Sequence, residues 1–260
     1  MVELSIITVC FNAEKEIKTT IESIIYQTYK NFEYIIIDGA STDQTIQVAK
    51  EYIPIFKKMN INFKIISEPD KGIYDAMNKG AAIANGKWIN FMNAGDSYYS
   101  KDSLSIFFNS HIPEDISYCF GDTVEIYEWG NMLFSKKKKK DPIMPFCHQS
   151  VFVRNEIMKK YKFNLQYHII SDYDLFYRLK KDNHKYEERS VIITKYDASN
   201  GISSRQPLKV DLEYLKLYKI NTKWYYPFIV LKLYITRGIK NTFKFLLPKP
   251  LITQIKRHTY

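Results

Sequence analysis

The chain has 260 residues, 45% of them hydrophobic and 15% aromatic, which is long and apolar enough for a large folded core and excludes an intrinsically disordered protein. Its net charge of +10 lies entirely in residues 205–260, which hold 9 Lys and 3 Arg against Asp211 and Glu213, so the neutral remainder argues against a nucleic-acid-binding protein. Three widely spaced cysteines argue against a disulfide framework or a metal knuckle and fit a reducing compartment.

Strands and helices alternate through the first hundred residues. Apolar β-branched runs predict strands, and apolar residues three and four apart predict helices. The predicted strands cover 4–9, 32–37, 63–66 and 88–92, and the predicted helices cover 17–25, 46–53 and 73–84. We expect Asn12 to cap the first helix and Ser41 or Thr42 the second. This alternation predicts an α/β fold with a doubly wound, mostly parallel sheet.

The pattern becomes mixed after Ser100, which we expect to cap a helix. Short strands are predicted over 116–120, 124–129, 132–134 and 191–193, with one more after the sequence Cys147-His148-Gln149-Ser150. A helix is predicted within 167–181, and a further helical stripe is formed by Leu208, Leu212, Leu215 and Tyr218. The second half therefore predicts a mixed sheet followed by a helical tail.

Each predicted strand of the first half ends in a polar cluster. The clusters are Thr8–Asn12, Asp38–Asp43, Glu68–Lys71 and Asn93–Asp96. Because the carboxyl ends of parallel strands share one edge of a sheet, we expect these clusters to line one ligand crevice. Asp96 is a hard oxygen ligand suited to Mg²⁺ or Mn²⁺, although its sequence context is also ordinary turn chemistry. Neither a dinucleotide-binding fingerprint nor a P-loop follows the first strand.

Basic and aromatic residues alternate in the tail. Its most apolar stretch, 224–235, contains Lys232 and is shorter than the roughly 20 residues that a membrane-spanning helix needs. Such a composition is typical of a helix that lies in the plane of a membrane surface. The alternative is a C-terminal helix that packs on the domain and exposes a basic face. The coincidence of charge and aromatic residues favours the membrane surface.

Taken in order, the motifs resemble those of family 2 glycosyltransferases of the GT-A fold, and most of all the bacterial enzymes that build O-antigen and capsule repeat units. The resemblance covers about residues 3–205. Its motifs are Ile7–Asn12, Asp38–Asp43, Glu68–Gly80, Asn93–Asp96 and Ser171–Leu175. It implies an enzyme that binds a nucleotide sugar, usually a UDP-sugar, and inverts the anomeric centre when it transfers the sugar.

The resemblance also implies roles for the residues at the nucleotide end of the crevice. Thr8 and the backbone of Phe11 would line the base, and Asp38 would accept a hydrogen bond from a uracil N–H. A buried or capping Asp38 is the alternative, although a carboxylate that closes an apolar strand needs a partner. Asp70 and Lys71 would lie beside the uridine and the diphosphate.

The cation site implied by the resemblance is Asp96 together with Asn93. This pair matches the D-x-D-type metal motif of the family, with asparagine in place of its first aspartate. A divalent cation, Mn²⁺ or Mg²⁺, would neutralise charge on the departing diphosphate. The family often carries a basic residue where this chain has Met77, so Lys71 or Lys79 is expected to contact phosphate instead.

Asp172 falls at the position of the family's catalytic base, where a carboxylate takes the proton of the attacking acceptor hydroxyl. Asp174 is the competing carboxylate, since either residue could merely stabilise the start of a helix. His148 and Gln149 are expected near the acceptor or the metal, and a structural hydrogen-bonded histidine is the alternative.

The sequence thus predicts a metal-dependent inverting transferase in which 1–100 binds the nucleotide sugar, 101–205 completes the same domain with the acceptor and catalytic half, and 206–260 is a membrane-associated tail. The donor would be a UDP-hexose, with glucose or galactose favoured over N-acetylhexosamine. The acceptor would be an undecaprenyl-diphosphate-linked saccharide of O-antigen, lipopolysaccharide or capsule synthesis.

The predicted location is the cytoplasmic face of the inner membrane, with an anionic membrane surface and no nucleic acid as partner. Two rival functions are a nucleotidyltransferase, whose usual glycine-rich loop is missing, and a non-catalytic basic membrane-surface module.

Overall fold

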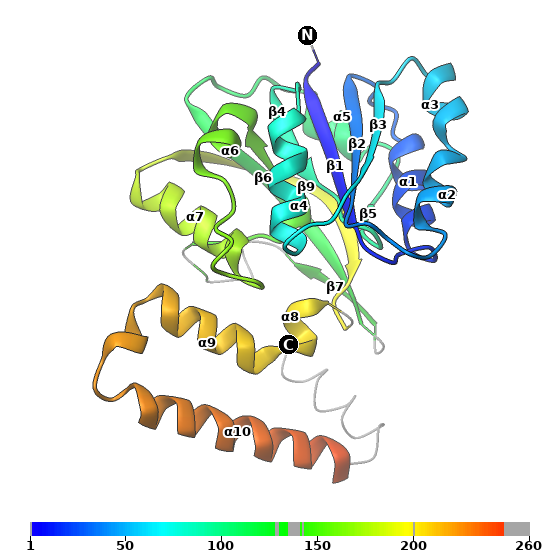
Figure 1. The fold of residues 1–260 in the computed structure, drawn as a ribbon. Helices are drawn as coiled ribbons and strands as arrows, with labels where there is room; N and C mark the ends of the chain where they lie inside the picture. The colour runs from blue at the N-terminus through cyan, green and yellow to red at the C-terminus, as the bar shows by residue number, and fades with distance from the viewer. Residues whose placement is uncertain (1, 128–129, 135–140, 142, 200, 247–260) are drawn as a thin grey trace. The chain divides into compact units, whose positions relative to one another are not determined.

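The computed structural model describes residues 2–127, 130–134, 141, 143–199 and 201–246, and of 132–134 and 238–246 only the backbone (Figure 1). The chain forms two compact units. The first comprises Met1–Ile126 with Met132–Asp197, and the second comprises Tyr127–Asn131 with Ala198–Tyr260. The predicted division at residues 100 and 205 stays a prediction, and each unit is described by itself.

The first unit is built on one mixed sheet, whose described strands follow the order β3-β2-β1-β4-β8-β6-β9-β5, with β7 paired to β6. The strands are β1 (Leu4–Cys10), β2 (Phe32–Asp38), β3 (Phe63–Ser67), β4 (Trp88–Phe91), β5 (Ser97–Tyr98), β6 (Ile116–Tyr127), β7 (Gly130–Phe134), β8 (Val151–Arg154) and β9 (Lys185–Asp197). β3, β2, β1 and β4 run parallel, whereas β8 is antiparallel to both β4 and β6. The predicted parallel first half and mixed second half are confirmed.

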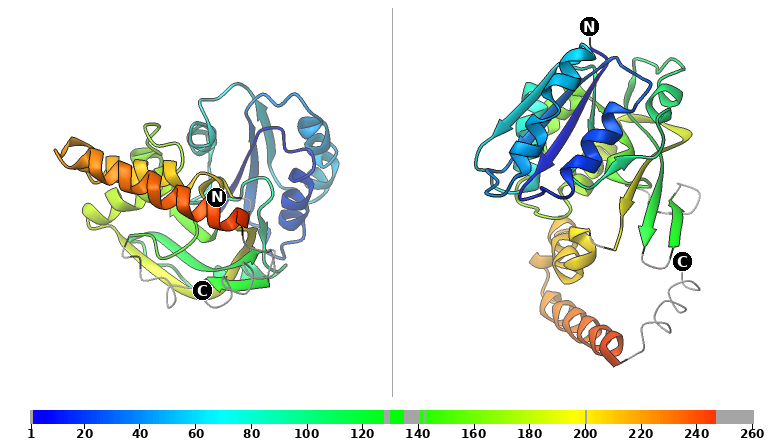
Figure 2. Two further views of the ribbon diagram at one scale, coloured as in Figure 1. Left: turned by 90° about the horizontal axis from the view of Figure 1, so that it is seen from below. Right: turned by 90° about the vertical axis from the view of Figure 1, so that its right-hand side faces the viewer.

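Helices cover both faces of the parallel strands, which explains why β1 and β2 are buried along their whole length. On one face, α1 (Ile17–Ile25), α2 (Thr45–Lys50) and α3 (Ile53–Lys58) share a core cluster with the even-numbered residues of β1, such as Leu4 and Ile6. On the other face, α4 (Ile73–Ile83) packs against β1 and β2; it lies to the left of β1 in Figure 1, with α1–α3 to the right, and Figure 2 gives two further views of these layers. The alternation of side chains along a strand produces these two layers.

Gly80 allows α4 to approach the sheet closely. A Cβ atom at this position would lie 2.6 Å from Ile7 Cγ2 and 3.2 Å from Ile37 Cγ1. Both atoms belong to β-branched side chains of fully buried strands, so neither can move far. A larger residue at position 80 would therefore separate α4 from the strands whose ends form the site.

Three predicted details of the first half are wrong. Neither Ser41 nor Thr42 caps the second helix, α2, whose N-cap position is Gln44. Asn12 does not cap α1, which begins at Ile17. Asn12 has a φ of 48°, and its Oδ1 accepts a hydrogen bond from the N–H of Thr42. The single helix predicted over 46–53 is two helices, α2 and α3, because Pro54 has no N–H with which to continue the first one. Ile53 is consequently 46% exposed and does not belong to the apolar face.

The second half differs from the prediction in its element lengths. The strands expected over 116–120 and 124–129 are one continuous strand, β6, whose pairing with β9 shifts register between Phe120 and Thr123. Residues 128–129 lie outside the described chain. β9 is much longer than the predicted 191–193, and its ends carry charged residues such as Lys185, Glu188 and Lys195 that hide the strand in the sequence. The remaining helices are α5 (Ser103–Phe107), the unpredicted α6 (Asn155–Tyr161) and α7 (Ser171–Lys181), with a 3₁₀ turn, η1, over His148–Ser150.

The second unit is helical, as expected. It contains α8 (Ile202–Arg205), α9 (Pro207–Leu217), the 3₁₀ turn η2 (Ile220–Thr222) and α10 (Tyr226–Leu246). Arg237 on α10 pairs with Asp211 on α9, with Nη2 2.6 Å from Oδ2. No helix in the described part of the chain is both long enough and apolar enough to span a bilayer.

Candidate active site

The polar clusters after the parallel strands meet at one edge of the sheet, as predicted. The N–H of Asn12, after β1, donates to Ser41 Oγ of the loop after β2 at 2.8 Å. The N–H of Glu68, after β3, donates to the carbonyl of Asp38 at 3.0 Å, and the N–H of Ala94, after β4, donates to the carbonyl of Val9 at 3.2 Å. Four segments that are far apart in the sequence are thus joined into one rim.

Phe11, Gly39 and Asp70 form one corner of this rim. The Phe11 side chain is 63% exposed, an unusual position for a large aromatic ring. A Cβ atom at Gly39 would lie 2.5 Å from Asp70 Oδ2 and in ordinary contact with Phe11 Cδ2 at 3.5 Å, so a larger residue would displace the Asp70 carboxylate. The corner combines an open aromatic face with a carboxylate, as a stacked and hydrogen-bonded nucleobase requires.

Asp38 is fully buried, and its carboxylate is surrounded by donors. Oδ1 accepts hydrogen bonds from the Ser41 hydroxyl and, at 3.6 Å, from the Cys10 thiol, while Oδ2 accepts from the Ser41 N–H at 2.9 Å and the Ser67 hydroxyl at 2.6 Å. Burial, together with the Asp38 charge, raises the pKa of Cys10, which keeps the thiol a donor. Asp38 joins β1, β2 and β3 here, and its contact with uracil stays a prediction.

Thr8 lies in the core beneath the rim. Its hydroxyl donates to the Met92 carbonyl at 2.7 Å and accepts from the Tyr34 hydroxyl at 2.9 Å. Both hydrogen-bonding functions of the side chain are therefore used inside the fold. A contact between Thr8 and a base stays a prediction that nothing in this arrangement tests.

The two candidate phosphate-binding lysines differ in their surroundings. Lys79 Nζ lies 2.8 Å from Glu68 Oε1 and donates to the Pro69 carbonyl at 2.7 Å. Hydrogen bonding to Glu68 raises the pKa of Lys79. Lys71 is exposed at the start of α4, next to Gly72, whose φ is 111°. Lys71 is thus the better placed of the two to reach a diphosphate.

The loop after β4 is a tight turn fixed by Thr20 of α1. The Thr20 hydroxyl donates to the Asp96 carbonyl at 2.8 Å and accepts from the Gly95 N–H at 2.9 Å. Gly95 has a φ of 97°, a conformation that favours glycine. The turn therefore gives Asn93 and Asp96 a fixed backbone, which is what a binding pair needs.

Two features of this loop fit a divalent cation. The Asn93 Oδ1 atom is buried and has no hydrogen-bond partner within the described chain, an arrangement that costs about 1–3 kcal/mol unless something binds it. Burial also raises the pKa of the Asp96 carboxyl to about 7, although hydrogen bonds from Gln149 and the Asn93 backbone act to lower it. Although no group of three His, Cys, Asp or Glu side chains occurs among the described residues, an amide oxygen and a carboxylate are hard ligands that suit Mg²⁺ or Mn²⁺.

Asp172 and Asp174 differ sharply although both belong to the first turn of α7. Asp172 is partly exposed, and its Oδ1 accepts hydrogen bonds from the Tyr74 hydroxyl at 3.1 Å and the Tyr173 N–H at 2.8 Å. Asp174 is buried, with its Oδ2 2.8 Å from Nε of Arg178. Asp174 is therefore held in an ion pair inside the fold, whereas Asp172 is open to the rim.

His148 and Gln149 connect the cation loop to Asp172. The imidazole of His148 has Nδ1 3.7 Å from Asp172 Oδ2 and Nε2 3.1 Å from Asn93 Nδ2. Gln149 is only 4% exposed, and its Nε2 donates to Asp96 Oδ2 at 3.2 Å. Burial lowers the pKa of His148, and the nearby Asp172 opposes that shift. The expected contact of these two residues with an acceptor stays a prediction.

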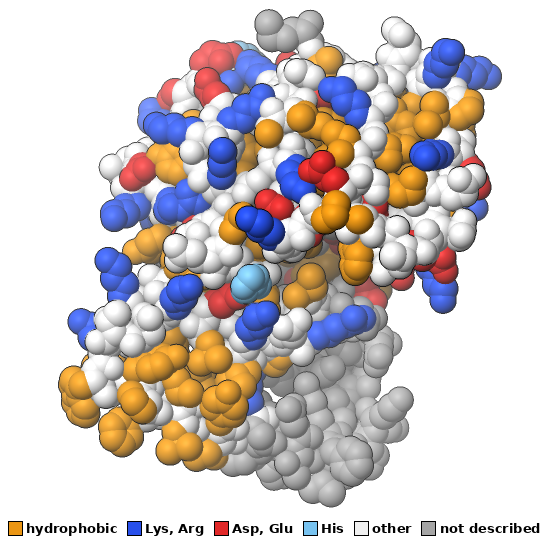
Figure 3. All heavy atoms as spheres, viewed as in Figure 1, with side chains coloured by type: hydrophobic (Ala, Val, Ile, Leu, Met, Phe, Trp, Pro, Cys, Tyr) orange, Lys and Arg blue, Asp and Glu red, His pale blue; other side chains and the backbone are white. Residues whose placement is uncertain are grey.

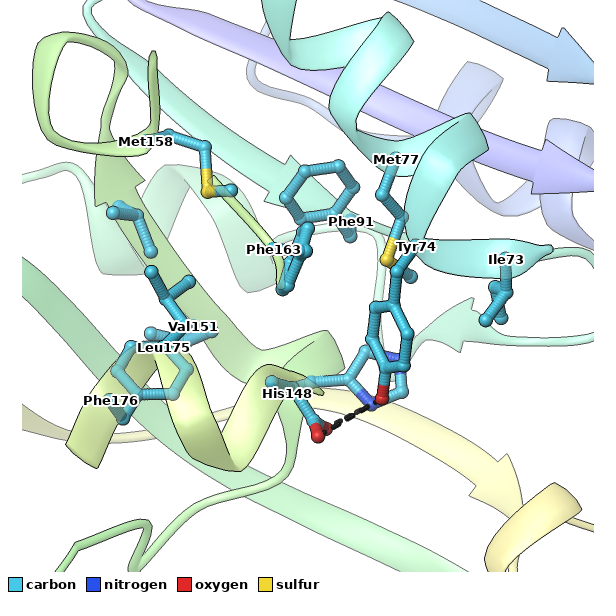
Figure 4. A pocket seen from close by; sticks show the side chains of 12 residues that line it. Ile73, Tyr74, Met77, Phe91, His148, Val151, Met158, Phe163, Leu175 and Phe176 are labelled. Atoms are coloured by element: carbon cyan, nitrogen blue, oxygen red, sulfur yellow. Dashed lines mark hydrogen bonds and ion pairs between the residues drawn. The ribbon is translucent and has the colours of Figure 1, made fainter. Parts of the chain in front are cut away.

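An apolar cavity of about 40 Å³ lies beside Asp172 and His148 (Figure 4). Its walls come from α4, β4, β8, α6 and α7, and Tyr74 and His148 are both among the side chains that line it. The lining includes Met77, Phe91, Val151, Met158 and Phe163. Met77, which stands where the family often has a basic residue, is thus part of an apolar wall.

Sequence reasoning missed three supporting residues. Tyr74 donates to the base candidate, Thr20 fixes the cation loop, and the amide of the buried Asn90 donates to the carbonyls of Gln149 and Val151 at 2.8 and 2.9 Å. An asparagine inside the apolar strand 88–92 was the one visible signal, because a buried amide must find partners.

A family profile described as glycosyl transferase family 2 matches residues 5–179, which span every element of this rim from β1 to α7. The chain belongs to this family. It is 30% identical over 235 residues to a PGL/p-HBAD biosynthesis glycosyltransferase of Mycobacterium bovis, covering 84% of this chain and 85% of that one. An uncharacterized glycosyltransferase of Methanocaldococcus jannaschii is 28% identical over 233 residues, with 85% and 79% covered.

Solved glycosyltransferase structures share the fold. S. aureus TarS residues 1–349 in complex with UDP superposes with a TM-score of 0.65 at 18% identity, covering 83% of this chain and 64% of that one. The mannosyltransferase PcManGT from Pyrobaculum calidifontis, in complex with GDP-Man and Mn²⁺, gives a TM-score of 0.67 at 13% identity, covering 89% and 69%. The protein is therefore a family 2 glycosyltransferase with the GT-A fold predicted from its motifs.

Proposed function

We propose that this glycosyltransferase transfers a hexose from a UDP-sugar with inversion, assisted by Mn²⁺ or Mg²⁺. The observation that carries the proposal is that one short network joins a cation-competent pair, Asn93 and Asp96, to an accessible carboxylate, Asp172, through His148. Family membership favours this function over the nucleotidyltransferase and the non-catalytic module that the sequence left open.

The corner of Phe11, Gly39 and Asp70 would receive the nucleoside. The exposed Phe11 ring offers a stacking face, and Asp70 Oδ2 can accept a hydrogen bond from the nucleoside. Asp70 Oδ1 is meanwhile engaged with the Gly72 N–H at 2.7 Å, which fixes the carboxylate. Lys71, the next residue, would place its charge beside the diphosphate, and Asp38 would hold this corner together.

Asn93 Oδ1 and the Asp96 carboxylate would hold the divalent cation, which neutralises charge on the leaving diphosphate when it is bound. The fold prepares both groups for that role. The Asn93 oxygen is buried without a partner in the described chain, and the Asp96 carboxyl has a pKa near 7, so a positive charge stabilises both.

Asp172 would act as the base. An acceptor hydroxyl gives its proton to the carboxylate, its oxygen forms a bond to C1 of the sugar, and the bond from C1 to the diphosphate oxygen breaks on the opposite face. UDP leaves with the electron pair of that bond. The Tyr173 N–H donates to Oδ1 at 2.8 Å, and the Tyr74 hydroxyl, whose proton is shared with the Ile169 carbonyl at 2.7 Å, lies 3.1 Å from the same oxygen, so Oδ2 is the oxygen left to receive the proton. A single displacement inverts the anomeric centre.

For the acceptor we propose an undecaprenyl-diphosphate-linked saccharide of O-antigen, lipopolysaccharide or capsule synthesis, reached at the cytoplasmic face of the membrane. The second unit supports a peripheral attachment there. One side of the chain from Trp224 through α10 exposes large apolar residues, and hydrophobic side chains gather over α10 in Figure 3. These residues are Trp224, Phe228, Leu231, Tyr234 and Ile235. Residues 205–260 also carry the whole net positive charge, which suits an anionic lipid surface.

Calorimetric titration with UDP, with and without Mn²⁺, tests the donor and the cation. We expect micromolar UDP binding that strengthens with Mn²⁺, weaker GDP binding, and loss of most UDP affinity in Phe11→Ala. A screen of UDP-glucose, UDP-galactose and UDP-N-acetylhexosamines by release of UDP then identifies the sugar, with either hexose expected first. Equal affinity for UDP and GDP would reject the choice of nucleotide, and no response to Mn²⁺ would reject the cation.

Sedimentation with vesicles tests the membrane surface. The full chain should bind vesicles that contain anionic lipid and not neutral ones, and Phe228→Glu with Leu231→Glu should abolish that binding. The matched control, Tyr26→Glu with Tyr99→Glu, changes two exposed aromatic residues outside the second unit. If the Phe228→Glu and Leu231→Glu variant instead lost a dimer and kept its vesicle binding, the apolar side of α10 would be a contact between two copies of the chain.

A further inference from the structure

The side chain of Gln149 is turned away from solvent and toward the cation loop. It is 4% exposed, and its amide nitrogen donates to Asp96 Oδ2 at 3.2 Å. Its backbone is fixed separately, because the Asn90 amide donates to the Gln149 carbonyl at 2.8 Å. The side chain can therefore be replaced without releasing η1, and in its present position it is shielded from an acceptor sugar.

The two contacts of His148 select a single tautomer. An amide nitrogen only donates, so Nε2 of His148 must accept from Asn93 Nδ2 across their 3.1 Å separation. The ring proton of the neutral imidazole is then on Nδ1, which faces Asp172 Oδ2 at 3.7 Å. One protonation state thus serves the cation loop and the base candidate together.

These contacts set which oxygen atoms remain for a cation. Because the NH₂ group of Asn93 faces His148, its Oδ1 faces the other way, where it is buried without a partner within the described chain. Gln149 occupies Oδ2 of Asp96 and leaves Oδ1 outside that hydrogen bond. An amide that rotated by half a turn would present a nitrogen, which cannot bind a metal ion.

We infer that His148 and Gln149 are positioning residues that aim Asn93 Oδ1 and Asp96 at the cation while His148 orients Asp172, in place of the acceptor contact suggested by the sequence. This inference rests on the proposed function, because it concerns the same cation and the same base. Residues that orient metal ligands in this way commonly contribute 10- to 100-fold to metal affinity.

Two histidine variants separate the two contacts. In His148→Gln the side-chain amide reaches about as far as Nε2 and keeps a carbonyl for Asn93, whereas in His148→Asn it reaches about as far as Nδ1 and keeps a donor for Asp172. Gln149→Met removes the donor to Asp96 at nearly constant volume. Gln47→Met on the exposed side of α2 is the matched control.

The readouts are UDP affinity without metal, Mn²⁺ affinity of the UDP complex by electron paramagnetic resonance, and kcat at saturating Mn²⁺. We expect unchanged metal-free UDP affinity in all four variants, which also shows that they fold. Mn²⁺ affinity should fall at least about tenfold in Gln149→Met and His148→Asn and remain within about twofold in His148→Gln and Gln47→Met. His148→Gln should instead lose kcat, because Asp172 has lost its neighbour.

Wild-type Mn²⁺ affinity in Gln149→Met and His148→Asn, combined with a raised KM for the acceptor, would overturn the inference and restore an acceptor contact. A wild-type enzyme that binds UDP without any response to Mn²⁺ would overturn the proposed use of the cation itself. The two failures are therefore distinguished by the wild-type protein alone.

Discussion

Asp38 at the end of β2 and Asp96 in the loop after β4 lie at the same edge of the sheet. The Asp38 carboxylate accepts hydrogen bonds from Ser41, Ser67 and Cys10 and is fully buried. Asp96 accepts one side-chain hydrogen bond within the described chain, from Gln149, and burial raises its pKa to about 7. A carboxylate supplied with donors stabilises a loop, whereas one short of donors in a shielded place is disposed to bind a cation.

The same contrast separates Asp172 from Asp174. It predicts the largest effect of any single substitution, a loss of kcat. Asp172→Asn should lower kcat by about 10²- to 10⁴-fold with unchanged UDP affinity, because only the base is lost. Asp174→Asn should instead lower the free energy of unfolding by about 1–3 kcal/mol, because Arg178 loses its partner, and retain most activity below the unfolding temperature. Steady-state kinetics and thermal unfolding of both variants decide the matter. A large loss of kcat in Asp174→Asn alone would reverse the assignment.

Substitutions at Asp96 and Asp38 are expected to give the next-largest effects. Asp96→Ala should reduce the strengthening of UDP binding by Mn²⁺ at least about tenfold and leave the unfolding temperature unchanged or higher, because a desolvated carboxyl is removed. Asp38→Asn should keep the response to Mn²⁺ and lose about 1–3 kcal/mol of stability, because an amide NH₂ would face hydroxyl and N–H donors. Calorimetry with and without Mn²⁺ and chemical denaturation measure the two quantities. The same Mn²⁺ response and the same stability in both variants would contradict the different roles assigned to Asp38 and Asp96.

A pH series sharpens the comparison further. Protons and cations compete for Asp96, whose pKa is raised from 3.8 to about 7, so Mn²⁺ affinity should rise by up to about tenfold per pH unit below pH 7 and level off above it. Without a cation the ionised carboxylate is unfavourable in the fold. The wild type should therefore lose stability relative to Asp96→Asn as the pH rises from 4 to 7. A flat Mn²⁺ affinity between pH 5.5 and 7.5 would contradict the raised pKa.

The smallest predicted effect concerns Lys71 and Lys79. Lys79 is engaged with Glu68 and the Pro69 carbonyl, whereas Lys71 is exposed. Lys71→Ala should weaken UDP binding a few-fold at low salt and less at high salt, because an exposed charge is screened. Lys79→Ala should leave UDP affinity unchanged and lower stability by less than about 1 kcal/mol. Titrations at two ionic strengths compare the variants, and a reversed order would assign the phosphate contact to Lys79.

Local patterns were sufficient to predict the framework of the site. Each parallel strand is an apolar run in the sequence, and the polar residues that follow the run mark where the strand ends. Parallel topology therefore predicts that Asn93 and Asp96 share one edge with the other strand ends, whereas Asp172, which lies in a helix, is assigned to the site only by the resemblance to the family. The missing N–H of Pro54 also indicates the break between α2 and α3, which helical spacing alone does not reveal.

The partners of these residues could not be predicted, because they depend on tertiary contacts. The donors around Asp38 come from β1, β3 and the loop after β2, and Ser67 is an ordinary strand-end residue in the sequence. The pair of Asp174 and Arg178 is the exception, because the two residues lie one turn apart in the same helix, and their spacing is compatible with the preference for Asp172 as the base. Tyr74 reaches Asp172 across 98 residues, and no local signal marks such a pair.

The hydrogen bonds of Asn90 hold η1 in place and so allow the chain before it to vary in length. Its amide nitrogen holds the carbonyls of Gln149 and Val151, and its oxygen accepts from the Tyr98 hydroxyl at 2.8 Å. The position of His148 and Gln149 is therefore determined by β4 and not by the length of chain that leads to them from β6. Changes in the length of that connection should therefore leave His148 and Gln149 beside the reacting groups.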